Sequence, residues 1–271
     1  MSAVRRWENL TWQDLIGLDA ERCVAILPVA AIEQHGPHLP LATDAIINRG
    51  ILDRALALAG SAADLYLLPE LPVGRSDEHQ AFPGTLTVPA DLLSRLWFEI
   101  GRSVHRAGLR KLVIVNSHGG QPQIADIVVQ DLRMQLGMLA VVANTFLLGE
   151  PERLFPDEER RHGIHGGAGE TSMLLHLRPE TVRRDLIGNF SAASIGLDRR
   201  NQELRFHTGN TIGWATQDLH PLGACGDARL ATAQAGQAII EHVARRLAVL
   251  LNEVAAYPLS TIKQGPLAEP R

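Results

Sequence analysis

The chain has 271 residues, of which 45% are hydrophobic, and its formal net charge is -4 at pH 7. This charge excludes the strongly basic surface of a nucleic-acid-binding protein, and no run approaches the roughly 18 consecutive apolar residues of a membrane span. The only cysteines, Cys23 and Cys225, argue against a disulfide framework, so we expect a cytoplasmic protein. The length suits one α/β domain, which we expect to cover residues 1–271.

Strand-like runs alternate with helical patterns along most of the chain. Short apolar runs predict buried strands, and apolar residues at helical spacing predict helices between them. The expected strands cover residues 23–29, 65–68, 111–115 and 138–143. The expected helices cover residues 44–58, 87–108, 124–136, 170–177 and 227–254. This alternation is typical of βαβ units, so we expect an α/β fold with a mostly parallel central sheet flanked by helices.

Three segments lack a clear helical or strand pattern. Residues 149–168 are rich in Pro, Gly, Glu, Arg and His, which predicts a long functional loop. Residues 198–226 are polar and have little periodicity. Residues 262–271 are expected to form a flexible tail.

Glu33 and His35, with Asp44 shortly after them, have the spacing of metal ligands. Residues two apart in an extended segment point to the same side, so Glu33 and His35 can converge while Gln34 faces away. The Gly and Pro residues between positions 36 and 40 let the chain fold back and bring Asp44 to the same place. Carboxylates and imidazoles suit Zn²⁺, Mn²⁺ or Fe²⁺. The alternative is a turn cluster in which Asp44 caps the following helix.

Two later segments carry further candidate ligands. His118 lies in a glycine-rich turn directly after an expected strand, where its ring is free to bind a metal, although a single loop histidine can also be merely solvated. His165 and Glu170 flank a glycine-containing run, and Glu170 also suits the first turn of a helix. Ligands collect beyond the carboxyl ends of parallel strands, so the segments at Glu33 and His118 point to one site.

Together these segments resemble the creatininase (creatinine amidohydrolase) family. Its members carry a Glu-x-His-Gly-x-His-Leu-Pro segment, a downstream Asp, an Asn-x-His-Gly-Gly-Asn-like turn, a His-x-x-Phe-Pro-Gly-Thr segment and a His-Ala-Gly-x-x-Glu-Thr-Ser segment. The corresponding positions here are residues 33–40, Asp44, residues 116–121, 79–86 and 165–172. The resemblance extends in order over residues 24–177, and the combination is specific although each piece alone is not.

The resemblance implies a two-metal amidohydrolase site, with Zn²⁺ favoured and Mn²⁺ or Fe²⁺ as alternatives. It assigns Glu33 and His118 to one cation, His35 to the other, and Asp44 to a bridging position. Two cations that share a carboxylate activate a water molecule and polarise a carbonyl group.

The catalytic positions that the resemblance implies are His165 and Glu170. His165 corresponds to the proton shuttle of the family. Creatininase carries a glutamate two residues after its metal-binding histidine, and the corresponding position in this chain is Gly120. Glu170 is therefore expected either to bind the second metal or to orient a residue that does, and we favour a ligand.

Five positions are expected to contact the substrate: Ser76, His79, Gly119, Arg161 and His162. Gly119 stands where creatininase has an aromatic residue, and Arg161-His162 replaces a Trp-Asp pair, so creatinine itself is not the expected substrate. Arg161 and Arg75 offer a place for an anionic group, although a solvated surface arginine has the same sequence context.

We therefore expect hydrolysis of a non-peptide C–N bond in a small amide, cyclic in the preferred case. Two alternatives stay within the family: a deformylase acting on a formamidopyrimidine nucleotide, and a peptidase of cofactor maturation. A metal-binding protein without catalytic activity is the alternative outside it. The resemblance also implies a homo-oligomer, a hexamer by analogy, and no nucleic-acid or membrane partner is expected.

Overall fold

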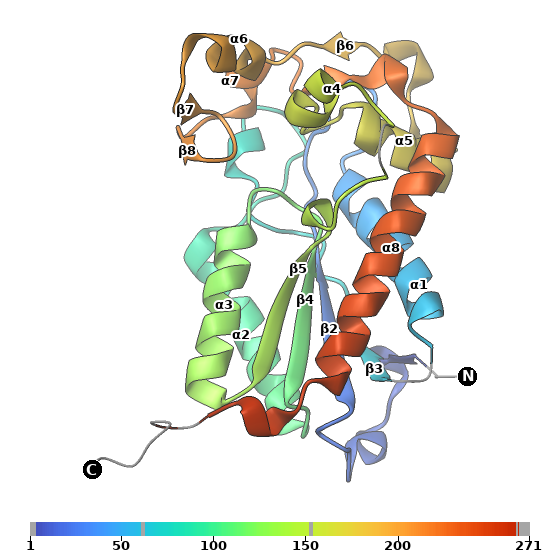
Figure 1. Ribbon diagram of the computed structural model, residues 1–271, viewed down its shortest axis with the longest axis vertical. Coiled ribbons are helices and arrows are strands. Elements are labelled where there is room, and N and C mark those ends of the chain that lie inside the picture. Colours follow the sequence, from blue (N-terminus) through green and yellow to red (C-terminus); the bar gives the residue numbers. More distant parts are fainter. Residues whose placement is uncertain (1–3, 61–62, 152–153, 264, 266–271) are drawn as a thin grey trace.

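The centre of the molecule is a parallel five-stranded sheet with the strand order β1-β3-β2-β4-β5 (Figure 1). The computed structural model describes residues 4–60, 63–151, 154–263 and 265. The strands are β1 (Arg5–Arg6), β2 (Cys23–Val29), β3 (Asp64–Leu67), β4 (Lys111–Asn116) and β5 (Leu139–Asn144). Every residue of β2 and β4 is buried, because helices cover both faces of the sheet.

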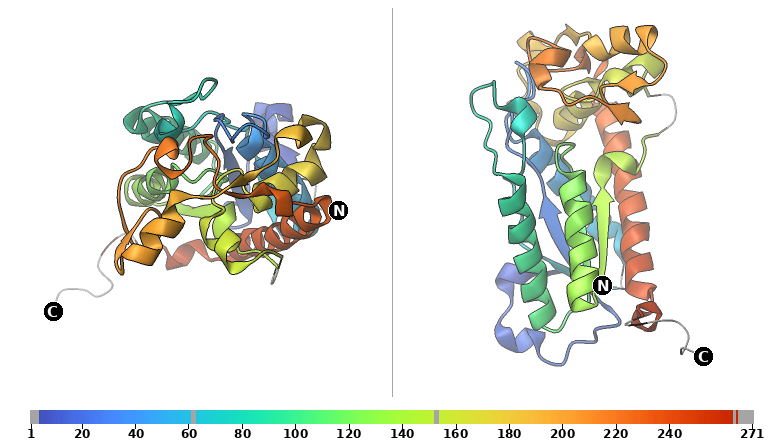
Figure 2. Two further views of the ribbon diagram at one scale, coloured as in Figure 1. Left: turned by 90° about the horizontal axis from the view of Figure 1, so that it is seen from above. Right: turned by 90° about the vertical axis from the view of Figure 1, so that its left-hand side faces the viewer.

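Two helical layers enclose this sheet, as the views in Figure 2 show. One layer contains α1 (Thr43–Ala59), α5 (Ala168–Leu177) and α8 (Ala233–Ala256), whose apolar faces form one core with the sheet. The opposite layer contains α2 (Ala90–Arg106) and α3 (Pro122–Leu136), packed around Trp97 and Leu132. The expected α/β class is therefore confirmed. No helix in the described part of the chain is long and apolar enough to cross a bilayer.

A cap of short elements covers the carboxyl ends of the central strands, at the top of Figure 1. Its helices are α4 (Asp157–His162), α6 (Ala193–Arg200) and α7 (Thr216–Leu219). Two small sheets complete it, β6 (Asn189–Phe190) with β9 (Gly226–Asp227) and β7 (Leu204–Arg205) with β8 (Asn210–Thr211). The polar stretch at residues 198–226 thus forms much of this cap.

Most expected helices differ from the structure by two or three residues at their ends, and two expected elements differ by more. The loop expected at residues 149–168 contains α4, which begins after Pro156 with acidic residues in its first turn and basic residues in its last turn, an order that complements the helix dipole. The helix expected from residue 227 begins only at Ala233, because the Thr232 side chain accepts a hydrogen bond from the Ala235 amide and caps it there. Of the expected tail, residues 264 and 266–271 lie outside the described residues.

Candidate metal centre

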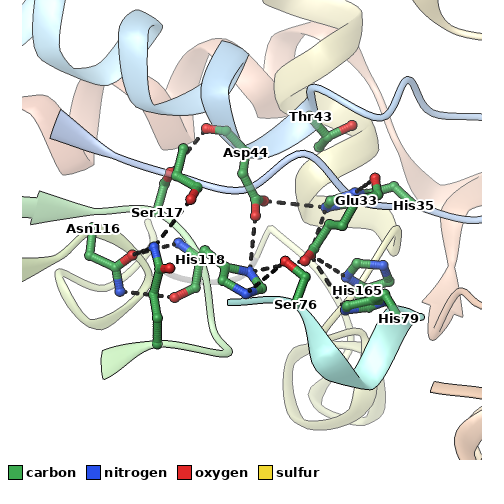
Figure 3. A network of polar contacts seen from close by, with 12 residues as sticks. Glu33, His35, Thr43, Asp44, Ser76, His79, Asn116, Ser117, His118 and His165 are labelled. Carbon is green, nitrogen blue, oxygen red and sulfur yellow. Dashed lines mark hydrogen bonds and ion pairs between the residues drawn. The ribbon is translucent and has the colours of Figure 1, made fainter. Parts of the chain in front are cut away.

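The candidate ligands come from four segments that meet at the carboxyl edge of the sheet (Figure 3). Glu33 and His35 follow β2, and Asp44 is the second residue of α1. His118 lies two residues beyond β4. The Asn48 side chain donates to the carbonyl groups of Val29 and Val115 at 2.9 and 3.0 Å, which joins the ends of β2 and β4 to α1.

His118 presents one ring nitrogen to two carboxylates. Its Nδ1 lies 3.3 Å from Glu33 Oε2 and 3.2 Å from Asp44 Oδ2. Its other nitrogen, Nε2, donates to the Arg75 carbonyl at 2.7 Å. This outer hydrogen bond leaves the Nδ1 lone pair free and orients the ring, as is usual for histidines that bind metals.

His35 faces the other oxygen of Asp44. Its Nε2 lies 3.3 Å from Asp44 Oδ1 and 3.9 Å from Glu170 Oε2, while its Nδ1 donates to the Glu33 carbonyl at 3.1 Å. Asp44 therefore offers one oxygen to each histidine. This arrangement suits a carboxylate that bridges two cations.

Three buried atoms of the cluster lack a hydrogen-bond partner: Glu33 Oε2, His35 Nε2 and Asp44 Oδ2. An unpaired buried polar atom is costly, and native structures rarely leave such groups together without a reason. The atoms are carboxylate oxygens and an imidazole nitrogen, and the Glu33, His35 and Asp44 donors lie within 4.8 Å of one another. The donor set therefore fits divalent metal ions.

Burial and the neighbouring charges shift the pKa values of the cluster in opposite directions. Burial alone would lower the pKa of His35, but Asp44, Glu170 and Glu33 raise it to about 10. Burial would likewise raise the pKa of Asp44, whereas His35 and His118 hold it below its ordinary value. Protons on the histidines thus neutralise the carboxylates when no cation does, so protons and metal ions compete for these groups.

Glu170 and His165 reach the cluster from the start of α5 and the turn before it. Glu170 Oε2 accepts a hydrogen bond from the Gly166 amide at 2.6 Å, and burial raises the pKa of this carboxyl to about 7. Together with His35 and His165 it forms a second group able to hold a metal ion. Glu170 therefore lies where it could bind the same metal ion as His35.

The His165 ring lies between the rings of His35 and His79, with centroid distances of 4.1 and 4.3 Å. Its Nε2 donates to the Gln34 carbonyl at 2.7 Å, which leaves the Nδ1 lone pair 3.8 Å from Glu33 Oε1. Burial, followed by the nearby His35, holds the pKa of His165 well below its usual range. The ring is therefore neutral and has a free nitrogen directed into the site.

The Gln34 side chain has a place in the site that its sequence position did not reveal. Alternation predicts that it faces away from Glu33 and His35. The side chain is buried, and its Nε2 donates to the Gly223 carbonyl at 2.8 Å. The same atom lies 2.7 Å from His79 Nδ1. Because Gly223 is far away in the sequence, no local spacing could have indicated this contact.

The five expected substrate positions fall into two groups. Ser76 and His79 lie in the cluster: Ser76 Oγ is 3.4 Å from His118 Nε2, and His79 Nε2 is 3.4 Å from Glu33 Oε1. Gly119 is exposed beside them. Arg161 and His162 instead contact α6, through Asp198 at 3.5 Å and Ser194 at 2.9 Å, and none of their described polar contacts reaches the cluster.

Comparisons with known proteins identify relatives of this chain in sequence and in fold. The chain matches the family model Creatininase, described as creatinine amidohydrolase, over residues 8–251. A mycofactocin precursor peptide peptidase of Mycolicibacterium smegmatis is 31% identical over 224 residues, which cover 81% of both chains. A putative creatinine amidohydrolase of Bacteroides fragilis superposes with a TM-score of 0.75 at 25% identity, over 99% of this chain and 100% of that one. A structure named Creatininase Mn shares the fold, with a TM-score of 0.74 at 23% identity over 93% of this chain and 98% of the other.

Proposed function

Because the chain belongs to the creatininase family of amidohydrolases, we propose that it hydrolyses an amide C–N bond with two divalent metal ions at the carboxyl edge of its sheet. The unpartnered buried atoms of Glu33, His35 and Asp44 carry this proposal. Glu33 and His118 would hold one cation, His35 and Glu170 the other, and Asp44 would bridge them. Zn²⁺ is our first choice for both positions, with Mn²⁺ or Fe²⁺ as alternatives.

His165 has the geometry of a proton carrier in this reaction. When bound, a pair of cations that shares a carboxylate lowers the pKa of a water molecule and polarises the substrate carbonyl. The free Nδ1 of His165 then accepts a proton and returns it to the leaving nitrogen. The hydrogen bond from Nε2 to the Gln34 carbonyl keeps the required tautomer, and the neighbouring tilted rings of His35 and His79 fix its orientation.

We propose a short peptide as the preferred substrate. The relative at 31% identity is named a peptide peptidase, and the exposed Gly119, around which a side chain would meet nothing within 4 Å, leaves room for a longer molecule. A small cyclic amide is the second candidate, favoured by the family description creatinine amidohydrolase. A phosphorylated substrate is disfavoured because Arg161 pairs with Asp198 and Arg75 with Asp77.

The test uses purified protein loaded with Zn²⁺ or Mn²⁺. It would be incubated with a set of short unmodified peptides and, separately, with creatinine and hydantoin, while mass spectrometry follows the products. We expect cleavage of at least one peptide, abolished by a chelator and restored by the metal. Metal-loaded protein that cleaves none of these compounds would contradict the proposed reaction.

Two further properties stay predictions. We propose that the protein assembles as a homo-oligomer, to be checked by light scattering, and that it acts in the cytoplasm on a small-molecule partner.

A further inference from the structure

Glu78 places a carboxylate beside the metal centre without contacting Asp44. Its backbone is fixed because Thr216 Oγ1 donates to the Glu78 carbonyl at 2.9 Å. The side chain is only 14% exposed, and Oε1 lies 3.7 Å from His118 Nε2 and 3.8 Å from His79 Nε2. Both distances are too long for hydrogen bonds. Among the described residues, no side chain donates a hydrogen bond to this carboxylate.

The position of Glu78 relative to the His118 ring separates it from the ligands proposed above. Those ligands meet the ring at Nδ1, which faces Glu33 and Asp44 at 3.3 and 3.2 Å. Glu78 approaches the opposite nitrogen, whose proton the Arg75 carbonyl accepts at 2.7 Å. Glu78 also forms, with Glu33 and His118, a group able to hold a metal ion. Its carboxylate receives a hydrogen bond from its own backbone but none from a described side chain, so it has capacity for a donor from a bound molecule.

Two glycines shape the space next to this carboxylate. A Cβ atom on Gly120 would lie 2.3 Å from Glu78 Oε1 and 2.5 Å from His118 Nε2, so any side chain there would displace the carboxylate. A Cβ atom on Gly119 would meet nothing within 4 Å. Glu78 thus packs against the backbone at position 120, beside an open approach at position 119.

We infer that Glu78 is a specificity residue that binds a protonated amino group of the substrate, close to the amide that is cleaved. This inference rests on the proposed function, since it names what the same site selects. The unpartnered buried atoms of Glu33, His35 and Asp44 mark the adjacent metal centre, where the amide to be cleaved would lie. A mostly buried carboxylate to which no described side chain donates is best satisfied by a charged N–H group, and it repels an anionic one.

The experiment measures ligand binding, so that it does not depend on turnover. The probes are glycinamide, which carries an ammonium group, and N-acetylglycinamide, which does not. Their dissociation constants for the Zn²⁺-loaded protein would be measured by titration calorimetry or ligand-observed NMR. The variants are Glu78→Gln and, as a matched control, Asp77→Asn, which changes a neighbouring carboxylate that pairs with Arg75 at 3.1 Å.

We expect the native protein and Asp77→Asn to bind glycinamide about tenfold more tightly than N-acetylglycinamide, a difference of about 1.4 kcal/mol. Glu78→Gln should reduce this ratio to about one while retaining its metal. An unchanged ratio in Glu78→Gln, equal binding of both probes to the native protein, or loss of metal from Glu78→Gln would each overturn the inference. Preference for glycinamide in a metal-loaded protein that cleaves no amide would instead refute the proposed reaction and leave the role of Glu78 standing.

Discussion

The two edges of the central sheet both bury ionisable groups, but they treat them in opposite ways. At the amino edge, Lys111 begins β4 with no exposed surface, and its ammonium group donates to the carbonyls of Glu21, Ala255 and Tyr257 at 2.6 to 2.7 Å. All three of its donors are used. At the carboxyl edge, Glu33, His35 and Asp44 are equally buried but keep three atoms without partners.

This difference separates a structural site from a binding site. Lys111 donates hydrogen bonds to carbonyls at the end of α8, where the helix dipole favours a positive charge. The buried ammonium group at the amino edge therefore needs no ligand from outside the protein. At the carboxyl edge, the free-energy cost of burying the cluster is offset only when a ligand supplies the missing charge. Substitutions should therefore affect stability at one edge and metal binding at the other.

The largest effect is expected for Asp44→Ala. Loss of the bridging carboxylate should empty both metal positions and lower kcat/KM by a factor on the order of 1,000 or more. The free energy of unfolding of the metal-free protein should change by at most about 1 kcal/mol, because His35 and His118 can release the protons that neutralised Asp44 once this carboxylate is gone. Metal analysis, kinetics and urea unfolding check this, with the exposed Asp53→Ala of the same helix as control. If Asp44→Ala retained both metal ions, the bridging role of Asp44 would be contradicted.

His165→Ala should leave the metals in place and lower kcat by about 100- to 10,000-fold, the usual contribution of a positioned proton carrier. His176→Ala, which changes an exposed histidine of α5, serves as control. Metal content and steady-state kinetics would be measured on both variants. Full activity in His165→Ala would refute the proton-transfer role and leave the His165 ring with a structural one.

Lys111→Met tests the opposite edge. The substitution keeps an unbranched side chain but removes the donor of three carbonyls, of which that of Ala255 is buried, and this should lower the free energy of unfolding by about 2–4 kcal/mol. Metal content and kcat/KM of the folded protein should remain within about twofold of native, since Lys111 contacts no residue of the cluster. Urea unfolding at equal metal saturation checks this, and the exposed Lys263→Met is the control. Loss of metal without loss of stability would contradict the contrast between the edges.

His38 should give the smallest effect, visible as a pH dependence. Its ring is buried, with Nε2 2.8 Å from Thr171 Oγ1, and burial followed by the nearby His35 lowers its pKa to about 4. The pKa of this histidine in the unfolded chain is near 6.5, so between about pH 4 and pH 6.5 the unfolded chain binds a proton that the folded protein does not. The contribution of neutral His38 to the stability of the folded protein is therefore complete above about pH 6.5 and falls as the pH decreases.

Comparison of native protein with His38→Gln isolates this effect. The stability difference between them should shrink by about 2 kcal/mol between pH 7 and pH 5, because only the native protein loses the contribution of a neutral His38. Urea unfolding at the two pH values measures it. A difference that stays constant would show that His38 does not titrate in this range.

Much of the fold was predictable because it depends on local patterns. The buried run at residues 23–29 coincides with β2, and the helical spacing from residue 44 coincides with α1 apart from one residue at each end. The short strand β1 was missed, since two residues carry no recognisable period. The helix at 233–256 was predicted to begin too early, because apolar spacing does not reveal where Thr232 caps it.

The sequence by itself determined that Glu33, His35 and Asp44 can meet, because alternation and a short fold-back fix their geometry within a few residues. The motif comparison correctly identified the family. Only the tertiary structure decided which distant residues join them. Gln34 donates to the Gly223 carbonyl, Glu78 packs against the backbone of Gly120, and Arg161 pairs with Asp198. The packing of the cap over the sheet sets these contacts, and no sequence spacing predicts them.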